Sequence, residues 1–159
     1  DLVETVGTLL QTWSVSPETL ILEITERTTL ATQDFEALRQ LHSLGVRLAI
    51  DDFGTGYSSL TYLRNLPLFE VKIDRSFVTD MVGNQDDANI VRSTIDLGHS
   101  MGLRVVAEGV SDAQTAEALV RLNCDYVQGF FVAHPMAGSE IATWVQGLGS
   151  KIEQRPGGK

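Results

Sequence analysis

Short apolar runs typical of β-strands alternate with longer amphipathic stretches typical of α-helices along the whole chain. Units that repeat over roughly 20 to 35 residues favour parallel strands joined by helical crossovers. The strand-like runs are apolar nearly throughout, as expected when both faces of a sheet are covered. The sequence therefore predicts an α/β fold with about five parallel strands alternating with helices. The expected strands lie at 19–25, 46–50, 70–73, 103–107 and 125–127.

Composition and charge exclude several classes of protein. The 159 residues include 21 acidic and 12 basic side chains, a formal net charge of −9, which excludes a nucleic-acid polymer as partner because phosphate backbones bind basic surfaces. The apolar runs are far shorter than the roughly 18 residues of a membrane span, so no direct membrane insertion is expected. A single cysteine, Cys124, excludes an intrachain disulfide and favours the reducing cytoplasm. His99 and His134 lack a metal-ligand spacing, and we expect them to be structural or surface residues.

Charged and amide side chains stand where the predicted strands end. The carboxyl ends of parallel strands open on the same side of a sheet, so we expect these side chains to converge there. Several carboxylates at one mouth form a site for hard cations, with two metals plausible, and an activated water at such a site can attack a phosphodiester. Lys72 would face the same side as Asp74 and orient, or help deprotonate, that water. The residues in question are Glu23, Glu26, Asp51, Asp52, Lys72, Asp74, Glu108 and Gln128.

Each of these residues also has a purely structural interpretation. A lone acid such as Glu23 is commonly a helix N-cap or half of a surface ion pair. Asp51 and Asp52 would point to opposite sides of a regular strand, although a turn at the strand end could bring both to the mouth. They could also form a simple turn that caps the next helix. Lys72 alone would be a solvated charge. The recurrence of polar residues after all five predicted strands favours the metal site.

Five motifs occur in order along the chain: LEITE at 22–26, LHSLGVRLAIDDFGTGYSSLTYLRNLP at 41–67, VKIDRSFV at 71–78, LRVVAEGV at 103–110 and CDYVQGFFVAHPM at 124–136. Together they resemble the EAL domains, bacterial cyclic di-GMP phosphodiesterases built on a modified TIM barrel. The resemblance covers nearly the whole chain except its last residues. It implies metal-dependent hydrolysis of cyclic di-GMP to linear pGpG in bacterial second-messenger signalling, with Mg²⁺ or Mn²⁺ as the cofactor.

The resemblance also implies a set of metal ligands. Glu23, Asp51 and Asp52 look like ligands, with Asp51 as the bridge between two ions. Glu108 would bind the second metal or its water. These roles agree with the metal site that the strand ends predict.

The remaining polar residues receive supporting roles from the same resemblance. Lys72 would hold the attacking water, and Gln128 would support the metal cluster. Glu26 resembles the glutamate that anchors the DFGTGYSSL loop, which couples metal binding to a dimer contact in the family. Asp74 would lie on the substrate side or support its neighbours.

The chain also departs from the pattern of the family. The Glu-Ala-Leu motif and the asparagine ligand of the following strand are absent, so we expect an upstream segment, or a sensor or cyclase domain, in a parent protein that is cytoplasmic or tethered to the inner membrane. Ser111 stands where another glutamate is common, and His134 stands where Arg or Lys is usual. These departures support an alternative function, a catalytically degenerate module that binds cyclic di-GMP or another protein.

The length of the chain predicts an incomplete TIM-type barrel, because a closed (β/α)₈ barrel needs about 200 to 250 residues. Residues 1–149 are assigned to the partial EAL domain and 150–159 to a polar tail that we expect to be disordered. Open strand edges predict a homodimer or other self-association. Because two expected metal ligands are absent, we expect the isolated chain to be weak or inactive.

Overall fold

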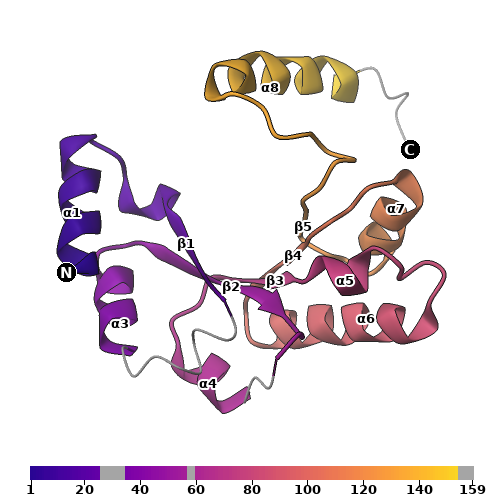
Figure 1. The fold of residues 1–159 in the computed structure, drawn as a ribbon, viewed down its shortest axis with the longest axis horizontal. Helices are drawn as coiled ribbons and strands as arrows, with labels where there is room; N and C mark the ends of the chain where they lie inside the picture. Colours follow the sequence, from indigo (N-terminus) through magenta and orange to yellow (C-terminus); the bar gives the residue numbers. More distant parts are fainter. Residues whose placement is uncertain (26–34, 57–59, 154–159) are drawn as a thin grey trace.

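The computed structural model describes residues 1–25, 35–56 and 60–153. Its centre is a sheet of five parallel strands in the order β1-β2-β3-β4-β5, which confirms the predicted α/β class (Figure 1). The strands are β1 (Ile21–Thr25), β2 (Arg47–Phe53), β3 (Glu70–Ile73), β4 (Arg104–Ala107) and β5 (Tyr126–Val127). The helices are α1 (Leu2–Thr12), the 3₁₀ turn η1 (Pro17–Thr19), α3 (Phe35–Ser43), α4 (Leu60–Asn65), α5 (Arg75–Val78), α6 (Gln85–Ser100), α7 (Ala113–Arg121) and α8 (Gly138–Glu153).

Side-chain caps mark where the crossover helices begin. Asn84 accepts a hydrogen bond from the backbone N–H of Asp86 at the start of α6. Asp112 accepts one from Thr115 at the start of α7. These bonds satisfy backbone donors that have no partner within the helix. The caps therefore define the residues at which α6 and α7 begin.

One face of the sheet holds the hydrophobic core. Ile50, Val71, Ile73 and Val105 point from successive strands into a cluster that also contains Ile95 of α6. Helix α6 contacts β3 and β4 and lies along this side of the sheet (Figure 1). Burial of these aliphatic side chains supplies the main stabilisation of the fold.

The opposite face is polar, which corrects the prediction that the strands are apolar nearly throughout. The parallel register places Glu23, Ala49, Glu70 and Arg104 in one row across four strands. Lys72 lies two residues beyond Glu70 and therefore on the same face. Apolar runs counted along the sequence hide this pattern, since only alternate positions of each strand share a face.

Both edges of the five-stranded sheet are unpaired among the described residues, because β1 and β5 are its end strands. Helix α8 lies apart from the other helices, on the far side of the sheet from α6 (Figure 1). Ile141 and Val145 of α8 are 48% and 53% exposed, and Phe130 after β5 is 62% exposed. Unpaired parallel edges beside apolar side chains are available for pairing with more polypeptide.

Helix α8 continues to Glu153, past the domain boundary expected at residue 149. Residues 154–159 lie outside the described part of the chain. No helix in the described part is both long and apolar enough to cross a membrane.

Asp125 ties the ends of α6, β4 and β5 together. Its Oδ2 accepts a hydrogen bond from the backbone N–H of Val105 at 2.9 Å and lies 2.9 Å from Nε2 of His99. Its Oδ1 lies 3.6 Å from Nη1 of Arg104. Burial acts to raise the pKa of Asp125, but the hydrogen bonds from His99 and Val105 outweigh it and hold the pKa below its usual value. The contact confirms a structural role for His99.

Replacement of this carboxylate should destabilise the fold. We expect Asp125→Asn to lower the free energy of unfolding by about 1.5 to 3 kcal/mol, the range for hydrogen bonds to charged groups, measured by urea denaturation. Because folding lowers the pKa, the stabilisation is present above the pKa of the unfolded carboxyl and is lost as pH falls through the folded value. Glu117→Gln, which breaks an exposed 3.9 Å pair with Arg121, is the matched control and should change little. Equal effects of the two substitutions would contradict this role.

Candidate functional site

An irregularity at the end of β2 brings two adjacent carboxylates to one side of the sheet. The β2–β3 register shifts between Ile50 and Phe53, and Asp52 has a φ of 55°, which turns the backbone away from the regular alternation of a strand. Thr55 stabilises the turn by donating hydrogen bonds to the carbonyl of Asp52 from both its N–H and its Oγ1. The strand therefore extends through both aspartates, and the turn at its end brings both to the mouth.

The structure brings three of the four predicted ligands into one carboxylate group. Asp51, Asp52 and Glu108 each offer a carboxylate oxygen, and these oxygens lie within 4.8 Å of one another. Glu108 is held beside β3 by its N–H, which donates to the carbonyl of Ile73 at 3.2 Å. Among the described residues, Oδ1 of Asp51 is a buried oxygen that accepts no hydrogen bond. A buried, unsatisfied carboxylate oxygen beside two further carboxylates fits a hard cation, so the residues present suit a divalent metal.

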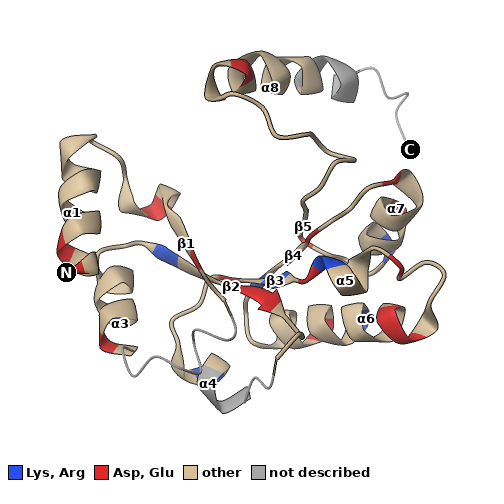
Figure 2. Cartoon of the chain, in the orientation of Figure 1, with Lys and Arg blue, Asp and Glu red and all other residues tan. Residues whose placement is uncertain are grey.

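Lys72 lies at the centre of the carboxylates. Its side chain is 5% exposed, and its Nζ is 2.7 Å from Oε1 of Glu23, 3.3 Å from Oδ1 of Asp51 and 2.6 Å from Oε1 of Glu108. Acidic and basic residues meet along the central strands (Figure 2). Glu23, the fourth predicted ligand, is not part of the group formed by Asp51, Asp52 and Glu108. It forms an ion pair with Lys72, which also pairs with Asp51 and Glu108.

The charge on Lys72 follows from these contacts. Burial acts to lower the pKa of the lysine, but hydrogen bonds with Glu108 and Glu23 and the charge of Asp51 overcome it, and the pKa is raised above its usual value. The amine is therefore a cation at neutral pH and acts as a hydrogen-bond donor. In this arrangement Lys72 can orient a water, whereas it cannot accept a proton from it.

Asp74 lies outside the group of Asp51, Asp52 and Glu108 and caps the next helix. It caps α5, a short helix that the sequence did not predict, by accepting hydrogen bonds from the N–H and the Oγ of Ser76. Burial acts to raise the pKa of Asp74, but the bonds with Ser76 lower it overall. Burial, together with the charges of Asp51 and Asp74, raises the pKa of Asp52. A cation bound at Asp52 would reverse that effect, because it would favour the ionised form.

Gln128 is joined to the site through the backbone. Its N–H donates to the carbonyl of Ala107 at 2.9 Å, and its carbonyl accepts from the N–H of Val110 at 3.1 Å. Gly129 permits this approach, because a Cβ at that position would lie 2.2 Å from the carbonyl oxygen of Val110. The loop that follows Glu108 is thereby fixed to the loop that follows β5.

Three further residues named in the sequence analysis lie away from the carboxylate group or outside the described residues. Glu26, the expected anchor of the DFGTGYSSL loop, lies outside the described residues. Cys124 is half-buried, and burial raises the pKa of its thiol to about 11. His134 stacks on Phe130 with ring centroids 4.4 Å apart.

Glu70 is a buried acid near the site, and it was not predicted among the polar residues at strand ends because it lies at the start of β3. It is 7% exposed, and its pKa is raised chiefly by burial, against the opposing charge of Lys72. The signal was its spacing, since residues two apart in a strand share a face. Glu70 therefore adds a further negative charge to the environment of Lys72.

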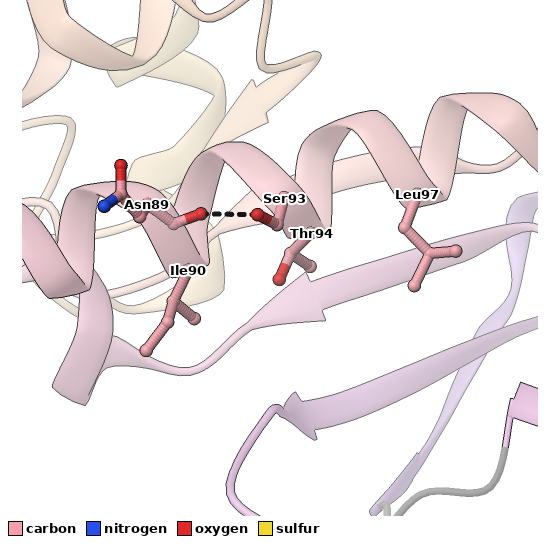
Figure 3. A pocket seen from close by; sticks show the side chains of 5 residues that line it. All are labelled: Asn89, Ile90, Ser93, Thr94 and Leu97. Carbon is pink, nitrogen blue, oxygen red and sulfur yellow. Dashed lines mark hydrogen bonds between the residues drawn. The ribbon is translucent and has the colours of Figure 1, made fainter.

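A separate pocket lies along α6 and does not belong to the carboxylate group. Its volume is about 300 Å³, and it is lined by Asn89, Ile90, Ser93, Thr94 and Leu97. The labelled side chains come from one face of the helix, and the bond drawn joins Ser93 Oγ to the carbonyl of Asn89 (Figure 3). No titratable side chain is among these lining residues, so the pocket offers no acid–base or metal chemistry of its own.

The family model described as EAL domain matches residues 1–135, and the chain belongs to this family. The bifunctional diguanylate cyclase/cyclic di-GMP phosphodiesterase MucR of Pseudomonas aeruginosa is 44% identical over 88% of the chain and 21% of its own length. The cyclic di-GMP phosphodiesterase NbdA of the same organism is 44% identical over 74% of the chain and 15% of its own length. The chain thus spans about a fifth or less of these two curated relatives.

Solved structures share the fold of the chain. A structure described as the Pseudomonas aeruginosa MucR phosphodiesterase in complex with cyclic di-GMP matches 88% of the chain and 57% of its own, with 44% identity and a TM-score of 0.83. The EAL domain of Mycobacterium smegmatis DcpA matches 91% of the chain and 66% of its own, with 41% identity and a TM-score of 0.86. EAL domains are TIM-like barrels, and the five parallel strands of this chain correspond to part of one.

Substitution of Gly129 tests whether the close contact between the loop after β5 and the loop after Glu108 stabilises the fold. We expect Gly129→Ala to lower the free energy of unfolding by about 2 kcal/mol or more, because the new methyl group would overlap backbone atoms that have little freedom to move. Gly138→Ala is the control, since a Cβ there meets nothing within 4 Å. Denaturation curves for the two variants give the comparison. If Gly129→Ala is as stable as the control, the close approach is not a constraint on the fold.

Proposed function

We propose that a domain containing this chain hydrolyses cyclic di-GMP to linear pGpG with Mg²⁺ or Mn²⁺ bound at the strand ends. The observation that supports this most is the group formed by Asp51, Asp52 and Glu108 with the buried ammonium of Lys72 beside it. The relatives named as cyclic di-GMP phosphodiesterases support the same substrate and reaction. Because the chain spans only part of each relative, the activity is proposed for the complete domain.

Four carboxylates would hold the metal in this proposal. Asp51, Asp52 and Glu108 would hold the ions, with Asp51 as the residue shared between them. Glu23 would complete the set from β1, where it already contacts Lys72. When bound, the ions would supply Lewis-acid stabilisation of the charge that develops on phosphate oxygens.

The remaining residues would position the water and the loops. Lys72 would donate a hydrogen bond that orients the attacking water, because its ammonium lies at the same strand ends as the carboxylates. Asp74 would support Asp52, while Gln128 and the Val110 backbone would hold the loop after Glu108 in place. Glu26 retains its proposed role as the anchor of the DFGTGYSSL loop.

The reaction would open one ring bond of the substrate. The water oxygen would form a new bond to phosphorus, and the phosphorus–oxygen bond to the 3′ position would break. One water proton would pass to solvent or a carboxylate, and the leaving oxygen would take up a proton. The products would be one free 3′ hydroxyl and one terminal phosphate, which is linear pGpG.

Hydrolysis of cyclic di-GMP tests this function. With a complete EAL domain that contains this chain, we expect pGpG to form in the presence of Mg²⁺ or Mn²⁺ and to disappear with excess chelator. Lys72→Ala should reduce turnover by about 100-fold or more, the scale of losing the orientation of the attacking water, as measured by chromatography of the products.

The test has a control substitution and two outcomes that would contradict the proposal. Arg92→Ala, which removes an exposed charge on α6, should retain turnover. Binding of cyclic di-GMP without turnover would favour the degenerate receptor that Ser111 and His134 suggest. Turnover that survives Lys72→Ala would refute the role of the lysine.

The chain alone should behave differently from the complete domain. We expect it to self-associate, since β1 and β5 present unpaired edges and exposed apolar side chains lie beside β5. Its hydrolytic activity should be weak or absent, because the metal site would lack ligands. Sedimentation velocity measures the first property. A monodisperse monomer with a cooperative thermal transition would contradict it.

A further inference from the structure

We infer that the ammonium of Lys72 is an internal cation that competes with divalent metal for the same carboxylates, so that metal binding must displace it. This inference rests on the proposed metal site and adds a regulating element to it. In the structure, one nitrogen contacts three carboxylates that come from β1, from β2 and from the residue after β4.

The shared oxygens are the first argument for competition. Asp51 and Glu108 belong both to the carboxylate group and to the ion pairs of Lys72. Oδ1 of Asp51 lies 3.3 Å from the nitrogen yet accepts no hydrogen bond. A metal ion would satisfy this oxygen, whereas the ammonium leaves it without a bonded proton.

Charge is the second argument. Lys72 supplies one positive charge to its three carboxylate contacts, and Asp52 lies beside them in the same group. The cluster therefore remains negative with the lysine in place. A divalent ion that entered would be attracted by these carboxylates and repelled by a buried ammonium only a few ångströms away, where screening by water is weak.

The competing interpretation predicts the opposite result. If Lys72 served only to hold the carboxylates in the correct geometry, its removal would loosen them and weaken metal binding. If it competes, its removal should strengthen metal binding while destabilising the metal-free protein, because three carboxylates lose their cation. The sign of the change in metal affinity separates the two interpretations.

Titration of the full chain with Mn²⁺ measures that sign. We expect Lys72→Met to bind Mn²⁺ about 10-fold more tightly than the unchanged chain, on the scale of one buried charge acting on another. Lys72→Arg keeps the charge and should not bind more tightly. Arg92→Met alters the net charge equally at an exposed position on α6 and should bind like the unchanged chain. Equal or weaker Mn²⁺ binding by Lys72→Met, or no binding by either protein, would overturn the inference.

A second measurement needs no substitution and covers the case in which Lys72→Met does not fold. The ammonium group of Lys72, buried and bonded to carboxylates, should give a protected ¹⁵N–¹H resonance, and saturating Mg²⁺ should shift or abolish it as its partners turn to the ion. A resonance unchanged by saturating Mg²⁺ would refute displacement.

These measurements are independent of hydrolysis. If Lys72→Met binds metal more tightly but the complete domain does not hydrolyse cyclic di-GMP, the proposed function is refuted and the competition between Lys72 and metal is supported. If the complete domain hydrolyses cyclic di-GMP but Lys72→Met leaves metal affinity unchanged, the competition is refuted and the proposed function is supported.

Discussion

The buried ammonium of Lys72 is the interaction on which the polar face of this sheet depends. It joins Glu23 on β1, Asp51 on β2 and Glu108 after β4 at the end of β3. Carboxylates brought this close repel one another, and their burial is unfavourable without a cation. Lys72 supplies that cation within the chain and thereby keeps three strand ends together. The same contacts leave an unsatisfied oxygen on Asp51, where a metal ion could bind.

The backbone around the site is shaped to bring these groups together. A positive φ at Asp52 brings neighbouring aspartates to one side of β2, and Gly129 allows the loop after β5 to contact Val110. The apolar core lies on the other face of the sheet and involves different residues of the same strands. Because side chains alternate between the two faces along each strand, the residues of the apolar core and the residues of the candidate metal site lie on opposite faces of the sheet.

Much of the fold followed from the sequence, because periodicity and helix caps are local signals. The strands predicted at 70–73 and 103–107 lie within a residue of the observed β3 and β4. The continuation of β2 through Asp52 was not predicted, since a non-glycine residue with positive φ has no reliable local signature. The convergence of strand-end carboxylates with Lys72 was predicted from topology, whereas the burial of Glu70 needed the register between strands.

The central claim is that Asp51, Asp52 and Glu108 bind metal beside Lys72. Anomalous diffraction from crystals containing Mn²⁺ tests it most directly, because the signal locates the ion without reference to activity. We expect an anomalous peak at coordination distance from the carboxylates of all three residues, with the Lys72 nitrogen farther than 3.3 Å from Oδ1 of Asp51 and farther than 2.6 Å from Oε1 of Glu108. Mn²⁺ bound elsewhere, with these carboxylates still paired to Lys72, would contradict it.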